Sequence, residues 1–273
     1  MPGGRDEVHA QLTDLLAPGG RLHHSTGITF DQDVLDNVTE RYLAQQGDVA
    51  RGGAMAVVTA GPPGAGKSFR TEHLVGYRRI DADEIKDLLL EHALALGLLD
   101  DATGILLSDM GPVSPRELSG RVHKGSTDVA EAVRFHAMAR KENVLIAGTL
   151  QWDGLPRQYA GDLFDFDYER LRIVDVEVPL SVAIERARQR WWHDRHTEPL
   201  GGRFMSDEAV KSYFDDPSPV SRCQAHADEL WDRTWEALDV VQERVEMTDV
   251  GATETTYTRR SEDGEIVEDE FPV

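Results

Sequence analysis

A glycine-rich stretch early in the chain constrains the fold more than any other feature. Residues 61–68 read Gly-Pro-Pro-Gly-Ala-Gly-Lys-Ser and match the pattern G-x-x-x-x-G-K-S/T in full. The residues before it, 55–60, form a mostly apolar run that is typical of a strand buried on both faces. A helical pattern follows over residues 68–75. Strand, glycine-rich loop and helix in this order predict a phosphate-binding loop within an α/β fold.

Each part of this loop has a role in binding a nucleoside triphosphate. Glycines let backbone N–H groups approach phosphate oxygens without a Cβ in the way, and the following helix adds partial positive charge. The lysine reaches the β- and γ-phosphates, and the serine hydroxyl binds Mg²⁺. The sequence therefore predicts binding of ATP or GTP, with ATP and Mg²⁺ as the expected ligands, by Gly61, Gly64, Ala65, Gly66, Lys67 and Ser68.

Strand and helix patterns alternate along the rest of the chain. We expect further strands at residues 77–80, 144–147, 171–176 and 240–245, and helices at 83–96, 115–141 and 180–193. This order predicts a three-layer α/β/α fold of the P-loop kinase type, with a mostly parallel sheet. We expect a helical extension over residues 1–50, a kinase domain over 51–246 with a lid at about 184–205, and an acidic tail over 247–273 with a small β-hairpin around Asp263-Gly264.

Composition narrows the set of partners. The 273 residues include 29 Lys and Arg against 50 Asp and Glu, a formal net charge of −21. So negative a chain repels a phosphate backbone and an anionic bilayer, and we expect no nucleic acid and no membrane as partner. No apolar run reaches the length of a spanning helix, and the first residues lack a signal-peptide pattern. With a single cysteine, Cys223, these features lead us to expect a cytoplasmic protein.

Two aspartates follow the second predicted strand. Asp81 and Asp83 lie where that strand gives way to a helix, which is the edge of an open α/β sheet where ligands bind. One carboxylate can support a Mg²⁺-bound water while the other accepts the proton of an attacking hydroxyl. We interpret Asp83 as the general base and Asp81 as the metal support. The alternative is that Asp83 only caps the helix that it precedes.

Arginines gather in and after the helix predicted at residues 180–193. Arg186 and Arg190 are four residues apart and share a helix face, and Arg203 follows two glycines in the predicted lid. Phosphoryl transfer needs cations near the charge that develops on the transferred group. We expect two of these arginines to bind the phosphate, although each taken alone is equally explained as a solvated surface residue.

These motifs resemble the zeta toxin family of P-loop kinases from about residue 28 to residue 214. The shared features are the phosphate loop, Ile80-Asp-Ala-Asp83, Gly148-Thr149, Ile184-Glu-Arg186 and Arg203. The resemblance implies transfer of the ATP γ-phosphate to the sugar 3′-hydroxyl of UDP-N-acetylglucosamine. It implies roles for Lys67 and Ser68 at ATP and Mg²⁺, for Asp83 as base, for Arg186 and Arg203 on the phosphate, and for Thr149 and Glu131 at the acceptor, with Asp128 competing for the last position.

Two positions depart from the family pattern, and both belong to the acceptor site. Ala147 stands where a glutamate is usual, and Gln151 where an arginine is common. Polar groups that bind a hydroxyl discriminate strongly between acceptors, so these losses favour a changed acceptor preference. The alternatives are therefore a kinase of another small acceptor (an antibiotic, a nucleoside or a dinucleotide) and a weakly catalytic ATP-binding regulator. A toxin of this family would also need an antitoxin protein as its partner.

Overall fold

The computed structural model describes residues 3–23, 27–215, 220–247 and 254–271. The chain forms two compact units, and each unit is assembled from three separate segments. Unit 1 comprises Met1–Tyr42, Ala82–Glu131 and Ala187–Asp207, and unit 2 comprises Leu43–Asp81, Ala132–Arg186 and Glu208–Val273. The helices α2 (Gln32–Gln46), α6 (His123–Ala139), α8 (Leu180–Thr197) and α9 (Asp207–Lys211) each contribute residues to both.

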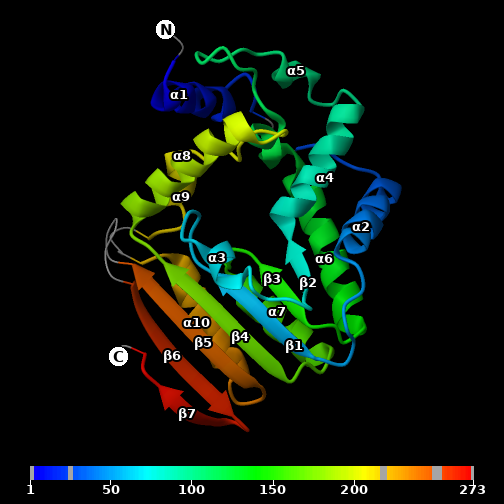
Figure 1. Cartoon of the computed structure of the whole chain (residues 1–273), viewed down its shortest axis with the longest axis vertical. Helices are drawn as coiled ribbons and strands as arrows, with labels where there is room; N and C mark the ends of the chain where they lie inside the picture. The colour runs from blue at the N-terminus through cyan, green and yellow to red at the C-terminus, as the bar shows by residue number, and fades with distance from the viewer. Residues whose placement is uncertain (1–2, 24–26, 216–219, 248–253, 272–273) are drawn as a thin grey trace. The chain divides into compact units, whose positions relative to one another are not determined.

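Unit 2 is built on a seven-stranded sheet with the order β2-β3-β1-β4-β5-β6-β7 (Figure 1). The first five strands in this order pair in parallel, and the last two pairings are antiparallel. The strands are β1 (Met55–Ala60), β2 (Arg78–Asp81), β3 (Val144–Ala147), β4 (Arg170–Glu177), β5 (Asp239–Met247), β6 (Glu254–Glu262) and β7 (Glu265–Asp269). This arrangement confirms the predicted α/β class with a mostly parallel sheet.

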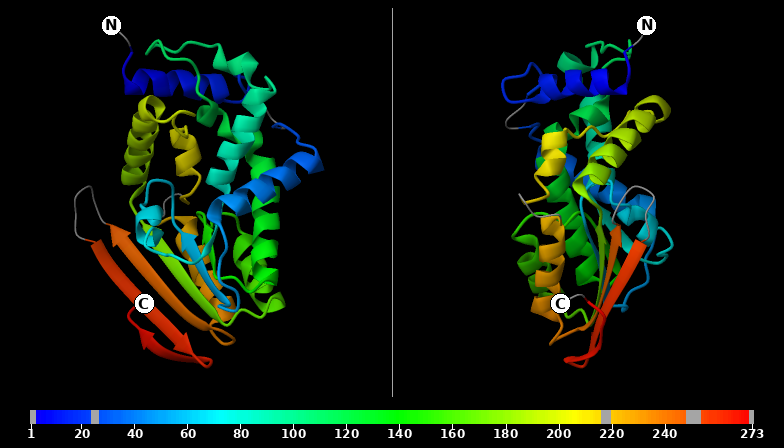
Figure 2. Two further views of the ribbon diagram at one scale, coloured as in Figure 1. Left: turned by 45° about the vertical axis from the view of Figure 1, so that its right-hand side comes forward. Right: turned by 90° about the vertical axis from the view of Figure 1, so that its left-hand side faces the viewer.

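The central strands form because their residues are apolar and can be buried. In β1 every residue after Met55 is buried, and its neighbours β3 and β4 lie on either side in parallel register. Helix α10 (Arg222–Thr234) covers one face of the sheet, and α7 (Leu155–Asp165) packs beside it (Figure 2). The buried residues of α10, which recur every three or four positions, are Cys223, His226, Ala227, Leu230, Trp231 and Thr234.

The end of the chain extends the sheet with a hairpin. β6 pairs with the whole length of β5, and β7 returns along β6 after a tight turn at Asp263-Gly264. Both turn residues have positive φ, 50° and 75°, as a two-residue hairpin turn of type I′ requires. The predicted hairpin is therefore present. Residues 248–253, within the predicted acidic tail, lie outside the described part of the chain.

Unit 1 consists of helical segments around an aromatic cluster. It contains α1 (Arg5–Leu16), α4 (Ala82–Ala95), α5 (Asp100–Thr103) and the 3₁₀ helix η1 (Pro115–Val122), with parts of α2, α6 and α8. His9 of α1 lies against Trp191 of α8 and Phe204, at ring distances of 5.5 and 4.8 Å. These contacts fix α1 on the second half of α8.

Two predicted helices differ from the observed ones. The helix after the phosphate loop, α3 (Lys67–Thr71), is shorter than the predicted 68–75, because Phe69 and Val75 are exposed and give a second turn nothing to pack against. The single helix expected at 115–141 is divided into η1 and α6, since Ser119 and Gly120 are weak helix formers.

Among the described residues no helix is long and apolar enough to span a membrane.

Candidate functional site

The phosphate loop of unit 2 joins β1 to α3. Gly61 has φ +127°, and a Cβ there would collide with the carbonyl oxygen of Val176 on β4, so only glycine fits this close approach. At Gly66, which precedes α3 with φ +97°, a Cβ would meet no atom within 4 Å, and this side of the loop is open. Lys67 Nζ donates to the carbonyl oxygens of Gly61 (2.7 Å) and Pro62 (2.8 Å) and lies back across the loop.

The segment after β3 is hydrogen-bonded to the phosphate loop. Thr59 Oγ1 at the end of β1 donates to the carbonyl of Gly148 (2.8 Å) and accepts from its N–H (2.9 Å). The N–H of Gly61 donates to the carbonyl oxygen of Thr149 (3.1 Å). Unit 2 therefore brings Thr149, a predicted acceptor residue, next to the loop predicted to bind ATP.

The next residues form a rigid turn that exposes an aromatic ring. Leu150 is buried with φ +57°, and its carbonyl oxygen contacts Nδ1 of His226 on α10 at 2.8 Å. Trp152 is 64% exposed, and its ring lies so close to Gly154 that a Cβ there would overlap it. Gln151, at the position that departs from the family pattern, donates its amide to the carbonyl oxygen of Ser212 (3.1 Å). The surface beyond β3 is thus aromatic and uncharged at residues 150–152.

The residues predicted to hold Mg²⁺ fit a magnesium ion that is bound mainly by phosphate and water. Ser68 is exposed next to Lys67, and the Asp81 carboxylate at the end of β2 accepts from Arg79 Nη2 (2.9 Å). Within the described residues no three His, Cys, Asp or Glu side chains cluster as metal ligands. Mg²⁺ typically takes one or two protein ligands and completes its shell with waters and substrate phosphates, so this donor set is sufficient.

Arg186, a predicted phosphate ligand, is half-buried on the part of α8 that belongs to unit 2. Its Nη2 donates to Sδ of Met247 at the end of β5 (2.9 Å). A thioether sulfur is a weak acceptor, so this contact leaves the guanidinium available for a stronger partner.

Asp83, the predicted base, lies in the first turn of α4 in unit 1. Its carboxylate is 52% exposed and accepts from Lys86 Nζ at 2.9 Å. Burial raises the pKa of this carboxyl, but the charges of Lys86 and Arg203 outweigh that effect, and its pKa lies below the ordinary value of 3.8. Asp83 is therefore ionised at neutral pH, as a group that accepts a proton must be.

Arg203 is held beside Asp83 by two hydrogen bonds. Its Nη2 donates to the backbone carbonyl of Asp83 (2.6 Å) and to the carboxylate of Asp87 (2.8 Å). Asp87 also accepts two hydrogen bonds from Arg116 of η1, at 3.0 and 2.9 Å. Unit 1 therefore brings two predicted site residues together and surrounds them with charged groups that the sequence did not single out.

The acidic candidates on α6 differ in their partners. Asp128 is bound to Lys124 one turn earlier, at 2.7 and 3.0 Å, in a surface ion pair. Glu131 is half-buried further along the helix. His123, at the start of α6, is influenced by the charges near Asp83. Burial and the charge of Lys86 lower the pKa of His123, and the charge of Asp83 opposes this shift.

Sequence reasoning missed three charged residues next to Asp83 and Arg203. Lys86 and Asp87 lie three and four positions after Asp83 and share its face of α4. This helical spacing was visible in the sequence and could have identified both residues. Arg116 carried no local signal, because its partner Asp87 is 29 residues away in sequence.

A buried carboxylate behind the phosphate loop, Glu177, was also missed. Burial, with the neighbouring Asp175, raises its pKa to about 8.

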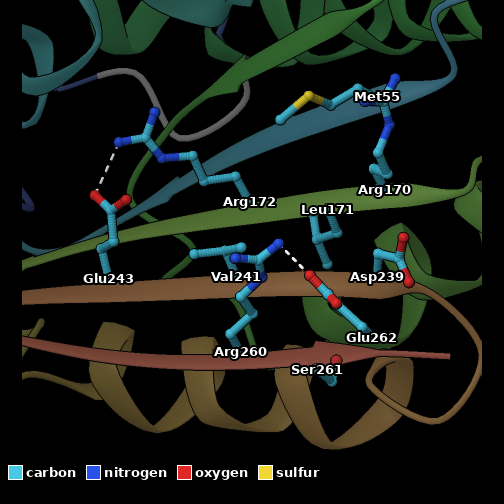
Figure 3. A pocket seen from close by; sticks show the side chains of 10 residues that line it. All are labelled: Met55, Arg170, Leu171, Arg172, Asp239, Val241, Glu243, Arg260, Ser261 and Glu262. Atoms are coloured by element: carbon cyan, nitrogen blue, oxygen red, sulfur yellow. Dashed lines mark hydrogen bonds and ion pairs between the residues drawn. The ribbon is translucent and has the colours of Figure 1, made fainter. Parts of the chain in front are cut away.

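A separate cavity of about 420 Å³ opens on the face of the sheet opposite α10 (Figure 3). It is lined by the first residues of β1, β4 and β5 and by the last residues of the antiparallel β6, so it lies at the edge of the sheet opposite the phosphate loop. Arg172 is paired with Glu243 (2.8 Å), and Arg260 with Glu262. Since these cationic groups are already bound to carboxylates, we assign no ligand to this cavity.

The fold and the loop define the class. A phosphate loop at the carboxyl end of β1, in a parallel sheet with the order β2-β3-β1-β4-β5, is the arrangement of a P-loop protein. The zeta toxin family model matches residues 39–220. The chain belongs to the zeta toxin family, and the resemblance seen in its sequence is confirmed. No curated protein matches the chain.

Solved structures support the fold. The chain is similar to one from the PezAT chromosomal toxin–antitoxin system of Streptococcus pneumoniae, with a TM-score of 0.56, 13% identity, and coverage of 88% of this chain and 81% of that one. It is also similar to chains from AvrRxo1-ORF1:AvrRxo1-ORF2. The structure with sulphate ions has a TM-score of 0.52, 12% identity, and coverage of 96% and 69%. The structure with ATP has a TM-score of 0.53, 13% identity, and coverage of 86% and 67%.

Proposed function

We propose that the chain transfers the γ-phosphate of ATP to a hydroxyl group of a small acceptor. The observation that carries this proposal is the phosphate loop, which is open at Gly66 and crossed by Lys67, in a member of the zeta toxin family. The similar AvrRxo1 structure with ATP supports the choice of nucleotide. Gly61, Gly64, Ala65 and Gly66 would bind the phosphates through their backbone N–H groups.

The proposed chemistry needs a base, a metal and cations. Ser68 and Asp81 would hold Mg²⁺, which neutralises charge on the β- and γ-phosphates when it is bound. Asp83 is ionised and would accept the proton of the acceptor hydroxyl as that oxygen attacks phosphorus. Arg186 and Arg203 would bind the transferring phosphate and stabilise its developing charge.

For the acceptor we propose the sugar 3′-hydroxyl of UDP-N-acetylglucosamine, with Thr149 and Glu131 as acceptor-binding residues. The proposal rests on membership of the family and on the place of Thr149 beside the phosphate loop. A nucleotide sugar is an anion. In this acidic chain, Lys67, Arg186 and Arg203 would supply the positive charge that attracts it.

A different small acceptor is the second candidate, and the surface beyond β3 favours it. Gln151 is bound to Ser212, Ala147 has no polar group, and Trp152 presents an exposed ring at the edge where α/β proteins bind ligands. An exposed ring can stack on the sugar or base of any such acceptor, and the absence of a charged side chain at residues 147 and 151 removes groups that would select one set of hydroxyls. An antibiotic, a nucleoside or a dinucleotide would fit such a surface.

A phosphorylation assay with labelled ATP tests the proposal. The purified chain is incubated with Mg²⁺ and UDP-N-acetylglucosamine, and in parallel with a panel of hydroxyl-bearing metabolites. We expect a labelled acceptor, and loss of labelling in Lys67→Ala and in Asp83→Asn. Full acceptor-dependent activity in Asp83→Asn would remove the base assignment. Tight ATP binding with no product across the panel would favour a regulator over a kinase.

We also propose a partner and a compartment. The PezAT and AvrRxo1 structures describe a toxin–antitoxin system and a two-component complex, which supports an antitoxin protein as a partner of this chain. The acidic surface supports our proposal that neither nucleic acid nor a membrane is a partner, and that the chain acts in the cytoplasm.

A further inference from the structure

The carboxylate of Asp87 lies between two arginines from different parts of unit 1. Arg116 of η1 approaches it with Nε and Nη2, and Arg203 approaches it with Nη2. All three side chains are at least four-fifths buried. A carboxylate that accepts bidentately from one guanidinium and again from a second is fixed in place by both, because bidentate geometry leaves little rotational freedom.

The same Arg116 also holds the backbone of the loop that carries Arg203. Its Nη1 donates to the carbonyl oxygen of Gly201 (3.2 Å). The backbone N–H of Arg116 donates to the carbonyl oxygen of Leu200 (2.9 Å). Gly201 has φ +78° and no room for a Cβ, which would collide with Ser114 before η1. The loop and its arginine are thus both tied, through Arg116 and Asp87, to the face of α4 that carries Asp83.

This network occupies only part of the Arg203 guanidinium. Nη2 makes both hydrogen bonds, to Asp87 and to the backbone of Asp83, and Nε lies 3.9 Å from the Asp83 carboxylate. Nη1 is buried, and within the described residues it has no hydrogen-bond partner. A buried N–H group without a partner costs free energy, so the two hydrogen bonds of Nη2 are what keep the guanidinium in this position.

We propose that Asp87 is a positioning residue for phosphoryl transfer. It holds the guanidinium of Arg203, the proposed phosphate ligand, beside the base Asp83, and Arg116 holds Asp87. The proposal rests on the proposed kinase function. The two aspartates differ in their surroundings: two arginines bind the mostly buried carboxylate of Asp87, whereas the Asp83 carboxylate accepts from Lys86 and is 52% exposed.

The experiment compares Asp87→Asn, Arg203→Ala and the double variant. We expect Asp87→Asn to lower kcat for UDP-N-acetylglucosamine phosphorylation about 10- to 100-fold, since misplacing a catalytic group by about 1 Å costs up to about 100-fold. ATP affinity should change less than about twofold, and the double variant should be no slower than Arg203→Ala alone. Asp87→Glu should recover part of the rate. Glu91 lies on the same helix as Asp87 and forms an exposed pair with Arg41 of α2, so Glu91→Gln is the matched control and should keep the wild-type rate.

A second measurement needs no acceptor. Binding of ADP, Mg²⁺ and aluminium fluoride, which mimics the transferring phosphate, should weaken by the same factor in Asp87→Asn and Arg203→Ala, while binding of ADP alone stays unchanged. If the wild type binds this mimic but phosphorylates no UDP-N-acetylglucosamine, the proposed acceptor fails, and the binding of the mimic by the two variants decides the role of Asp87. The role fails if the losses of the two single variants multiply in the double variant, if Asp87→Asn raises kcat, or if the wild type binds neither ATP nor the mimic.

Discussion

Asp83 and Lys86 are one helical turn apart on α4, and their contact sets the charge state of the proposed base. Lys86 is one of only five lysines in the chain, and it is itself mostly buried, with 17% of its side chain exposed. Its ammonium group favours the ionised form of Asp83, which is why the pKa of that carboxyl lies below 3.8 despite partial burial. A base held ionised by a neighbour works over a wider range of acidic pH.

Replacing Lys86 should therefore move the acidic limb of the pH–rate profile. In Lys86→Gln the attraction that lowers the pKa of Asp83 is lost while its burial remains, so the pKa rises. A base is active above its pKa, and the fall of kcat/KM with decreasing pH should begin at a higher pH than in the wild type. The profile is measured between pH 4 and 8 with saturating ATP. An unchanged limb would mean that Asp83 is not the group whose ionisation limits the rate.

At the same scale, local spacing predicts some of the proposed site residues, while the contacts of others depend on tertiary structure. The loop residues and Asp83 are predicted from local spacing, because the phosphate motif and the strand-to-helix turn are continuous in the chain. Asp87, Arg116 and Arg203 meet across 29 and 116 residues, and such pairings depend on tertiary packing that no local pattern contains.

Among the elements, α10 was missed although its signal is present. Its buried residues recur with helical spacing, and Ser221 accepts a hydrogen bond from the N–H of Cys223 as an N-cap. The residues between these buried positions of α10 are polar, and the sequence of the helix therefore resembles that of a loop. The opposite error occurred at α3. The sequence predicts a helix over residues 68–75, but the observed helix ends at Thr71 because its second turn would have no surface to pack against.

Helix α1 depends on one buried histidine. His9 contacts the backbone carbonyl of Met205 at 3.2 Å and packs against Trp191 and Phe204. Burial lowers its pKa below 6.5, and the charge of Arg188 acts in the same direction, against the weaker effect of Asp207 at 3.9 Å. Docking of α1 therefore favours the neutral form of His9.

The docking of α1 should weaken as the pH falls. A group whose pKa is lowered by folding contributes stability above its ordinary pKa, and this contribution is lost as the pH falls from the ordinary pKa through the lowered one. We expect the hydrogen-exchange protection of α1 amides, corrected for intrinsic rates, to be lower at pH 5.5 than at pH 7.5. His9→Phe keeps the ring contacts and has no titrating group, so its protection should not depend on pH. Equal protection of the wild type at both pH values would contradict this role.

At the scale of the whole molecule, the fold class and the family were within reach of the sequence, whereas the order of the strands in the sheet was not predicted. The five parallel strands alternate with helices, and that alternation, with one complete phosphate motif, is enough to define the class. The division into two units was not predicted. Both units are assembled from segments far apart in the chain, and no change of composition marks where one gives way to the other.

A toxin role is a property of the whole chain in a cell. If the chain phosphorylates an essential metabolite such as UDP-N-acetylglucosamine, expressing it alone should arrest growth, and expressing Asp83→Asn at the same level should not. The measurement is culture density after induction, with protein levels compared by blotting. Arrest that persists in both Asp83→Asn and Lys67→Ala would mean that the effect does not come from phosphoryl transfer.

The last strand has a consequence for how copies of the chain meet. β7 ends the sheet with every residue exposed, including Ile266 and Val267, and an open strand of this kind can add a second copy edge to edge. Here Glu265, Glu268 and Asp269 lie on the same short strand. Two such strands would bring like charges together, so at neutral pH the acidic C-terminus opposes self-association and aggregation through the open edge of the sheet.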